Sequence, residues 1–243
     1  MRIVVVYPDL LGTYGDGGNG LILAKRAEWR GHQVSLVGAP SDAPLPEADL
    51  YCLGGGEDGP QVRAARSLME DGTLARRMHD GAVVLAVCAG YQIVGRSFPG
   101  ADGAVHEGLG LLDITTAKSE LPRAVGEVVA DCALVPTITG FENHGGRTTL
   151  GASATPLATV RSGVGNGDGS GTEGALGDRI VGTYLHGPAL ARNPALADLL
   201  LGWALGTDPV TLAALDDEAA MSLREERLGP RRGHRRRRLR RRV

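Results

Sequence analysis

The sequence predicts an α/β protein built on a doubly wound, mostly parallel sheet with flanking helices. Short runs of β-branched and aliphatic residues alternate with longer segments whose apolar residues recur at helical spacing. Several of the short runs are apolar without interruption, which is typical of strands buried on both faces of a parallel sheet. Functional residues are therefore expected beyond the carboxyl ends of the strands, where sites form in such folds.

The first half of the chain contains the clearest elements. Strands are expected at residues 3–7, 34–37, 50–53 and 82–87, and helices at residues 21–30 and 62–78. Each helix is followed by a glycine, Gly31 or Gly81, a residue that readily adopts the left-handed conformation at a helix end. The third strand runs into three glycines at residues 54–56, and the fourth ends at Cys88.

The second half is less regular. Strands are expected at residues 111–116, 124–129, 147–150 and 179–185, and closing helices at residues 194–205 and 210–223. Residues 163–177 are rich in Gly, Asn and Asp and are expected to form a flexible hairpin loop. No Gly-Lys-Ser/Thr sequence follows these glycines, so no phosphate ligand is assigned to the loop.

Length and composition indicate one globular domain with a charged tail. The 243 residues, 42% of them hydrophobic, predict a single domain over residues 1–230 and a disordered Arg-rich tail over residues 231–243. The tail holds nine arginines, and without them 17 basic side chains oppose 28 acidic ones, a formal charge of −11. The tail is interpreted as a solvated appendage or as a weak contact with an anionic membrane, and nucleic-acid binding is disfavoured.

Cysteine usage and hydropathy indicate the cellular compartment of the protein. The chain opens directly on a strand and contains no run of about 18 apolar residues. Its three cysteines are irregularly spaced, which fits neither a disulfide framework nor a zinc site. We expect a cytoplasmic protein without an export signal, peripheral at most at the inner face of the membrane, with reduced thiols and no metal.

Cys88 has the sequence context of a nucleophile. It follows a buried strand and precedes a helix start, with the small residues Ala86, Ala89 and Gly90 around it. This pattern predicts a nucleophile elbow, a tight turn that exposes the side chain next to a helix N-terminus that favours the thiolate. A free cysteine after a buried strand is more often a small core residue. The elbow context favours the nucleophile at Cys88 and leaves Cys52 and Cys132 as core residues.

His186 is the expected base. It follows the strand at residues 179–185 and lies 98 residues from Cys88. Because the carboxyl ends of parallel strands meet at one edge of a sheet, the two side chains can lie together there. A histidine in that position can take the thiol proton and later return it to a leaving group.

Three motifs together resemble class I glutamine amidotransferases of the cobyric acid synthase-like branch. They are residues 88–92, the glycines at 54–56, and residues 184–188, and the resemblance extends over about residues 1–205. Within this branch, residues 14–19 and 141–148 are similar to the stand-alone, GatD-type glutaminase subunits of lipid II isoglutaminyl synthases. The resemblance implies the amidotransferase form of the predicted α/β sheet.

The resemblance also implies the roles of the site residues. Cys88 would form a glutamyl thioester and His186 would act as its base, while backbone N–H groups of Gly55 or Gly56 and of Ala89 would stabilise the oxyanion. Three further residues would contact glutamine: Arg123 through its α-carboxylate, and Gln92 and Tyr91 as pocket residues. For Arg123, a surface arginine with no ligand is the alternative.

One departure from the family pattern affects the expected mechanism. Most class I amidotransferases carry a glutamate two residues after the histidine, whereas this chain has Pro188 there. We expect His186 to lack a carboxylate within this chain and hypothesise that a partner supplies one. The alternative is an acid from this chain, with Glu142, Glu57 and Asp58 as candidates.

The sequence assigns no step of the reaction to three polar residues in the motifs that carry the resemblance. Glu142 and His144 are expected to be structural, because short polar loop residues often bond nearby backbone. Asp16 lies in the glycine-rich loop after the first strand, where it would cap a helix or contact a partner.

The expected function is a glutaminase that supplies ammonia to a Mur-ligase-like synthetase in a heterodimer. The synthetase would amidate the D-glutamate of lipid II, and ATP and magnesium would belong to it, so no cofactor is expected in this chain. Cobyrinic acid amidation is an alternative acceptor reaction, although those glutaminase domains are normally fused to their synthetase. A non-catalytic scaffold and another kind of cysteine hydrolase are the remaining alternatives.

Overall fold

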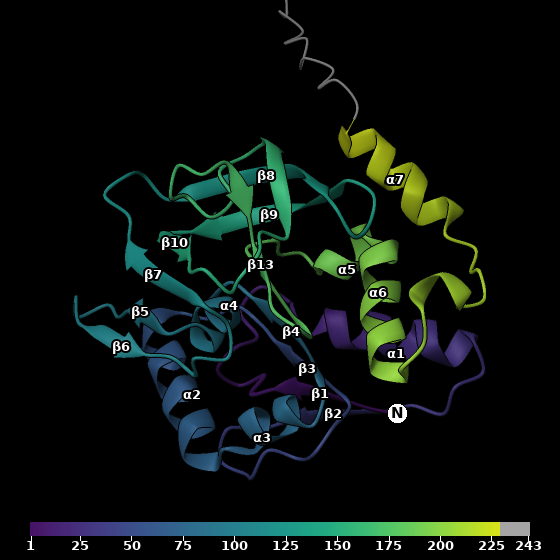
Figure 1. The fold of residues 1–243 in the computed structure, drawn as a ribbon, viewed down its shortest axis with the longest axis horizontal. Helices are drawn as coiled ribbons and strands as arrows, with labels where there is room; N and C mark the ends of the chain where they lie inside the picture. The colour runs from purple at the N-terminus through teal and green to yellow at the C-terminus, as the bar shows by residue number, and fades with distance from the viewer. Residues whose placement is uncertain (229–243) are drawn as a thin grey trace, which may run out of the picture.

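A six-stranded sheet forms the centre of the protein in this computed structural model, which describes residues 1–228 (Figure 1). The strand order is β13-β14-β4-β3-β1-β2. All neighbours are parallel except β13, which pairs antiparallel with β14 at one edge. The strands are β1 (Arg2–Val6), β2 (Ser35–Ala39), β3 (Leu50–Leu53), β4 (Val83–Val87), β13 (Ala175–Leu176) and β14 (Ile180–Thr183).

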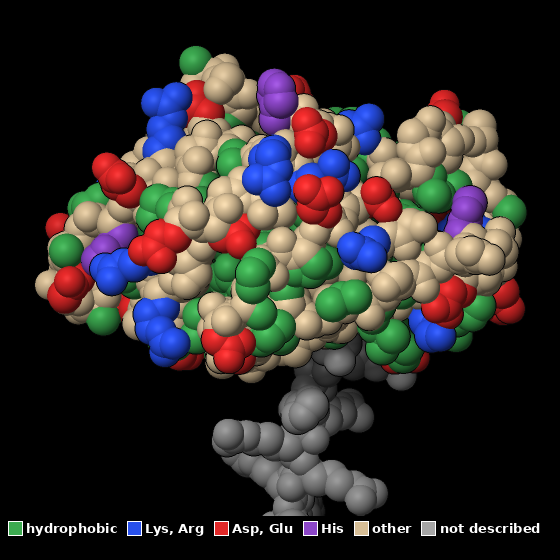
Figure 2. Space-filling view, turned by 90° about the horizontal axis from the view of Figure 1, so that it is seen from below, with side chains coloured by type: hydrophobic (Ala, Val, Ile, Leu, Met, Phe, Trp, Pro, Cys, Tyr) green, Lys and Arg blue, Asp and Glu red, His purple; other side chains and the backbone are tan. Residues whose placement is uncertain are grey.

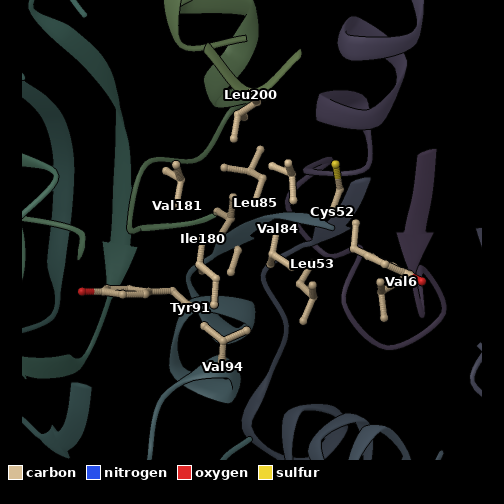
Figure 3. Close-up of a cluster of buried hydrophobic side chains, with 14 of the residues drawn as sticks. Val6, Cys52, Leu53, Val84, Leu85, Tyr91, Val94, Ile180, Val181 and Leu200 are labelled. Atoms are coloured by element: carbon tan, nitrogen blue, oxygen red, sulfur yellow. The ribbon is translucent and has the colours of Figure 1, made fainter. Parts of the chain in front are cut away.

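Helices cover both faces of this sheet, which confirms the doubly wound, mostly parallel architecture (Figure 1). On one face lie α1 (Gly18–Trp29) and α6 (Pro194–Leu205), and on the other lie α2 (Asp58–Asp71), α3 (Thr73–His79) and α4 (Ala89–Val94). Successive side chains of β4 point to opposite faces of the sheet (Figure 3). Leu85 points towards Leu200 of α6, while Val84 points towards the side of Val94 of α4. Every residue of β4 is buried, as the uninterrupted apolar run predicts.

Residues 97–173 add two four-stranded sheets. Their orders are β10-β7-β5-β6 and β12-β11-β8-β9. An isolated bridge between Phe141 and His186 ties the second of these sheets to the segment that follows β14. The strands are β5 (Ser97–Pro99), β6 (Val105–Glu107), β7 (Ile114–Lys118), β8 (Ala124–Cys132), β9 (Ile138–His144), β10 (Gly146–Leu150), β11 (Ala158–Ser162) and β12 (Thr172–Glu173).

Several element boundaries differ from the sequence-based expectation. The single helix expected at 62–78 is two helices, because Gly72 adopts a left-handed conformation with φ of 68° between α2 and α3. The segment expected as a loop at 163–177 contains the short strands β12 and β13. Strands β5, β6, β9 and β11 are short or polar and are absent from the sequence-based expectation.

The helix expected at residues 210–223 is also wrong in its extent. A short 3-10 helix, η1 (Pro209–Thr211), is followed by an irregular segment, and α7 (Glu218–Leu228) begins only after it. Tertiary bonds hold the irregular segment: Arg30 donates to the carbonyl of Ala213, and Arg26 pairs with Asp217 at 2.6 Å. The remaining helix, α5 (Ala189–Arg192), follows the segment that carries His186.

The surface has no plain segregation of charge on the face seen in Figure 2, where acidic and basic side chains lie next to one another and between apolar ones. Within residues 1–228, no helix has the length and apolar character needed to cross a membrane. The predicted tail at 231–243 lies outside the described residues.

Candidate active site

Cys88 occupies a strained turn between β4 and α4. Its φ of 51° and ψ of −104° are unusual for a residue with a side chain, and its backbone N–H donates to the carbonyl of Thr183 at 2.9 Å. The side chain is almost buried, with 6% of the residue exposed, and it reaches the wall of a cavity. The turn therefore has the backbone geometry that the predicted nucleophile elbow requires.

The Cys88 thiol is neutral in this environment. Burial, reinforced by the negative charge of Asp16, raises the pKa of the thiol to about 12, and the backbone N–H of Ala89 opposes this only in part. The helix that follows has six residues, too few for a strong N-terminal dipole. The helix start thus favours the thiolate, as expected, but burial outweighs it, so a nucleophilic Cys88 needs a base that takes its proton during attack.

His186 is held by a carboxylate from this chain. Its Nδ1 lies 2.9 Å from Oδ2 of Asp16, and the side chains are 3% and 0% exposed. The ring of Tyr14 packs against the imidazole with its centroid 4.6 Å away. The expectation that His186 lacks a carboxylate in this chain is wrong, and Glu142, Glu57 and Asp58 are not the acid.

The Asp16 contact determines which nitrogen of His186 can act as a base. A carboxylate accepts hydrogen bonds, so Nδ1 carries the proton and Nε2 is left with a free lone pair. Nε2 is buried and has no hydrogen-bond partner among the described residues. The imidazole is therefore not bonded to the Cys88 thiol in this structure. Such catalytic bonds often form only in the complex with substrate.

The loop that carries Asp16 is docked onto the segment that carries His186. A Cβ at Gly18 would lie 2.4 Å from Cγ of Pro188, so glycine permits this close approach. Asn19 accepts a hydrogen bond from the backbone N–H of Leu190 at 3.0 Å. Pro188, which stands where the family glutamate was expected, thus contacts the start of α1, two residues after the carboxylate.

The glycine turn at residues 54–56 contacts the His186–Asp16 pair. The backbone N–H of Gly55 donates to Oδ2 of Asp16 at 2.9 Å, so it is not directed at a substrate oxyanion. Gly56 and Ala89, in contrast, line the cavity beside Cys88. Of the predicted oxyanion-hole residues, Gly56 and Ala89 lie beside Cys88, and Gly55 instead bonds the Asp16 carboxylate.

Gly55 also cannot carry a side chain without disturbing His186. A Cβ there would lie 2.6 Å from Cε1 of the imidazole and 3.1 Å from Oδ2 of Asp16. We expect Gly55→Ala to lower kcat for glutamine hydrolysis by at least about tenfold, because an ångström-scale displacement of a catalytic group is costly. Gly59→Ala is the matched control, since a Cβ at Gly59 meets no atom within 4 Å. Equal ammonia release by the two folded variants would contradict this arrangement.

The cavity next to Cys88 has a volume of about 160 Å³ and a largely polar wall. Gln92 lies in the wall, as predicted, and its amide is held on both sides: Oε1 accepts from Gln61 at 2.9 Å, and Nε2 donates to the Tyr184 hydroxyl at 3.1 Å. Tyr91 does not line the cavity. It is buried in the apolar core (Figure 3), and its hydroxyl donates to Asn166.

Arg123 lies exposed at the cavity, immediately before β8. Its Nε donates to Oδ1 of Asn143 at 2.6 Å, and Nη2 donates to the Asn143 carbonyl at 3.0 Å. These two bonds fix the plane of the guanidinium. Nη1, which lies 3.9 Å from the position of a Cβ at Gly145, can still bind a carboxylate.

The other polar residues of the motifs have structural contacts. Glu142 accepts hydrogen bonds from the backbone N–H groups of Val164 and Gly165, each at 2.9 Å, which supports the expected structural role. The His144 ring stacks on Tyr184 with centroids 3.7 Å apart, and Nδ1 lies 3.0 Å from the Gly146 carbonyl. In the part of the chain that the structure describes, no group of three or more His, Cys, Asp or Glu is arranged to hold a metal.

Comparison with known proteins places this site in a family. Residues 2–194 match the CobB/CobQ-like glutamine amidotransferase domain. The chain is 36% identical over 222 residues to the glutamine-hydrolysing subunit GatD of lipid II isoglutaminyl synthase from Staphylococcus aureus (strain N315), covering 89% of this chain and 90% of that protein. It is 34% identical over 234 residues to the same subunit from Streptococcus pneumoniae (strain ATCC BAA-255 / R6), covering 93% and 90%.

The fold has matching solved structures as well. A crystal structure of a glutamine amidotransferase superposes with a TM-score of 0.58 at 17% identity, over 83% of this chain and 98% of that chain. This likeness concerns the fold alone. The predicted resemblance to class I glutamine amidotransferases and to GatD-type subunits is confirmed, because the family match spans most of the chain and both relatives are covered almost completely. This chain belongs to the CobB/CobQ-like glutamine amidotransferases.

Proposed function

We propose that this chain is the glutamine-hydrolysing subunit of a lipid II isoglutaminyl synthase, with Cys88 as nucleophile and His186 as base. The observation that carries the proposal is the buried His186–Asp16 pair, which lies at the same sheet edge as the Cys88 elbow and its cavity. The acceptor is inferred from the two GatD relatives that the chain covers almost end to end.

The first half of the reaction forms a thioester. The side-chain carboxamide of glutamine enters the cavity, and the Cys88 sulfur attacks the carboxamide carbon while Nε2 of His186 takes the thiol proton. The N–H groups of Gly56 and Ala89 stabilise the oxyanion, and Asp16 stabilises the imidazolium. The carbon–nitrogen bond then breaks, His186 returns the proton to the departing nitrogen, and ammonia leaves a glutamyl thioester on Cys88.

The second half regenerates the thiol. Nε2 of His186 takes a proton from a water molecule as its oxygen attacks the thioester carbon, again through an oxyanion. The carbon–sulfur bond breaks, Cys88 recovers its proton from His186, and glutamate is released. A thiol with a pKa near 12 suits this sequence, because the sulfur is a good nucleophile only while His186 holds its proton.

The ammonia would be used by a Mur-ligase-like synthetase in a heterodimer with this chain. That partner would bind ATP and magnesium and would convert the D-glutamate of lipid II to D-isoglutamine. The location would be cytoplasmic, at the inner face of the membrane where the acceptor lies. Contact of the arginine-rich tail with anionic lipid stays a prediction.

Reconstitution with the synthetase tests the acceptor. The two purified subunits, lipid II, ATP and magnesium are supplied with either glutamine or ammonium chloride, and the product is analysed by mass spectrometry. We expect amidated lipid II from both nitrogen sources, with Cys88→Ala losing only the glutamine-dependent product. Amidation with ammonia but not with glutamine would remove this chain from the reaction. Failure with both sources would overturn the lipid II acceptor.

Arg123→Ala is expected to weaken glutamine binding and to leave chemistry intact. A hydrogen-bonded ion pair with the α-carboxylate is worth about 2 kcal/mol, so KM should rise about 30-fold with little change in kcat. Arg161→Ala is the control, because Arg161 is exposed and pairs with Asp131 away from the cavity. An unchanged KM in Arg123→Ala would place glutamine elsewhere.

A further inference from the structure

Charged side chains of both signs line the cavity next to Cys88. Asp58 comes from the first turn of α2, whereas Lys118 ends β7 and Arg123 precedes β8. All three are exposed. A free amino acid presents the same pair of charges at its α-carbon, an ammonium and a carboxylate, at the end opposite to the side-chain carboxamide.

We propose that Asp58 binds the α-amino group of glutamine and that Lys118 shares the α-carboxylate with Arg123. This deepens the proposed glutaminase function and rests on it. The carboxamide would lie against Cys88, Gly56 and Ala89, with the α-carbon between the acidic and the basic side chains.

Neither Asp58 nor Lys118 is engaged elsewhere in the described part of the chain. The side chains make no hydrogen bond or ion pair there, unlike Arg123, whose plane is fixed by Asn143. Lys118 and Arg123 lie on the same side of the cavity: the backbone of Ser119 bonds the Gly145 carbonyl, and Nη1 of Arg123 faces Gly145. The chain segments that carry the two cations therefore both lie next to Gly145, and Asp58 comes from a different element.

A buried hydrogen bond ties the first turns of α2, which carry Asp58, to the helix that follows the nucleophile. Asp58 follows Gly56 by two residues and precedes Gln61 by three, so Asp58 and Gln61 share one face of α2. Gln61 is 3% exposed and donates to Gln92 on α4, the helix that follows Cys88. This buried bond fixes the start of α2 against the nucleophile turn. Glu57, the preceding acid, is outside the cavity wall.

A structural role for Asp58 makes a different prediction from a binding role. An acid in the first turn stabilises a helix through its dipole, and its loss would lower stability without changing which substrate is preferred. A role in binding the ammonium predicts a change in substrate preference. The two roles are therefore separated by comparing substrates that differ by one charged group.

The experiment measures kcat/KM of the full-length protein for three carboxamides: L-glutamine, glutaramate, which lacks the α-amino group, and 4-aminobutanamide, which lacks the α-carboxylate. We expect the wild-type protein to prefer glutamine over each analogue by about tenfold to a hundredfold, the scale of a lost charged hydrogen bond. Asp58→Asn should reduce the preference over glutaramate to within about threefold by raising KM for glutamine, and Asp58→Glu should restore part of it.

Two further variants complete the experiment: one removes a cation of the cavity, and the other removes an acid outside it. Lys118→Ala should reduce the preference over 4-aminobutanamide and leave the preference over glutaramate unchanged. Glu70→Gln, an exposed acid in the last turn of α2, should change neither preference. An Asp58→Asn protein that hydrolyses glutamine with the wild-type preference over glutaramate would overturn the proposed subsite. Absence of glutamine hydrolysis by the wild-type protein would overturn the proposed function, and the subsite with it.

Discussion

Replacement of Cys88 by alanine is expected to abolish glutamine hydrolysis and to leave the protein folded. Loss of a nucleophile that acts together with its base and acid lowers turnover on the order of 10⁶-fold in other enzymes. Since His186 Nε2 has no partner among the described residues, the substitution breaks no hydrogen bond to the base. The buried strand before Cys88 is unchanged, so the melting temperature should stay within a few degrees.

Cys52→Ala is the matched control for Cys88→Ala. Cys52 is also buried, and burial raises the pKa of its thiol to about 12 as well, but it lies within β3 and not in a turn. Ammonia release, measured by a coupled glutamate dehydrogenase assay, should persist in Cys52→Ala and disappear in Cys88→Ala. Residual activity in Cys88→Ala near that of Cys52→Ala would exclude the thioester mechanism.

Asp16→Asn is expected to have the second largest effect, a loss of about 10⁴-fold in kcat with KM nearly unchanged. The figure is the one known for the equivalent change in a serine protease triad, where the histidine takes the wrong tautomer. Oδ2 of Asp16 contacts both the Gly55 N–H and Nδ1 of His186, so an asparagine directs one atom at both groups. Its oxygen there keeps both bonds but removes the charge that stabilises the imidazolium, whereas its NH₂ group there moves the imidazole proton to Nε2, where it blocks the transfer from Cys88.

Asp9→Asn provides the control for Asp16→Asn. Asp9 lies in the same loop after β1, but it is exposed and bonds Ser41 rather than the site. Its variant should keep wild-type kcat. Asp16→Glu should recover part of the lost activity, because the longer carboxylate can still accept a hydrogen bond from Nδ1. A kcat for Asp16→Asn within tenfold of that for Asp9→Asn would mean that the carboxylate does not orient the base.

The parts of the site that depend on local sequence were predictable. The elbow at Cys88 follows from a buried strand that meets small residues, and the bounds of β3 and α6 coincide with the expected ones because each is a strong local pattern with glycine or proline at its end. The position of His186 followed from the rule that functional groups lie beyond the carboxyl ends of parallel strands.

The carboxylate was not predictable in this way. Asp16 and His186 are 170 residues apart, and no local pattern links a glycine-rich loop to a distant histidine. A signal was present all the same, since the loop follows β1, a central parallel strand whose carboxyl end lies at the same edge as that of β3. Pro188 suggested that the acid came from a partner, because the docking of Gly18 on Pro188 is a tertiary contact that no local pattern reveals.

The choice of oxyanion donors shows a similar limit. The three glycines at 54–56 were equivalent in sequence, and only the tertiary contact of Gly55 with Asp16 distinguishes them. The same holds for Tyr91 and Gln92, which are neighbours in α4 but face the core and the cavity respectively. In both cases the surroundings, and not the local residue pattern, decide the role.

The central claim is that the acid for His186 belongs to this chain. Glutamine turnover, in the absence of the amide acceptor, tests it most directly when wild-type and Asp16→Asn proteins are compared, each alone and in complex with the synthetase. The account predicts that the substitution lowers turnover by about the same factor, near 10⁴, in both forms. A complex in which Asp16→Asn turns over glutamine at the wild-type rate would show that the partner provides the carboxylate, and would contradict the account.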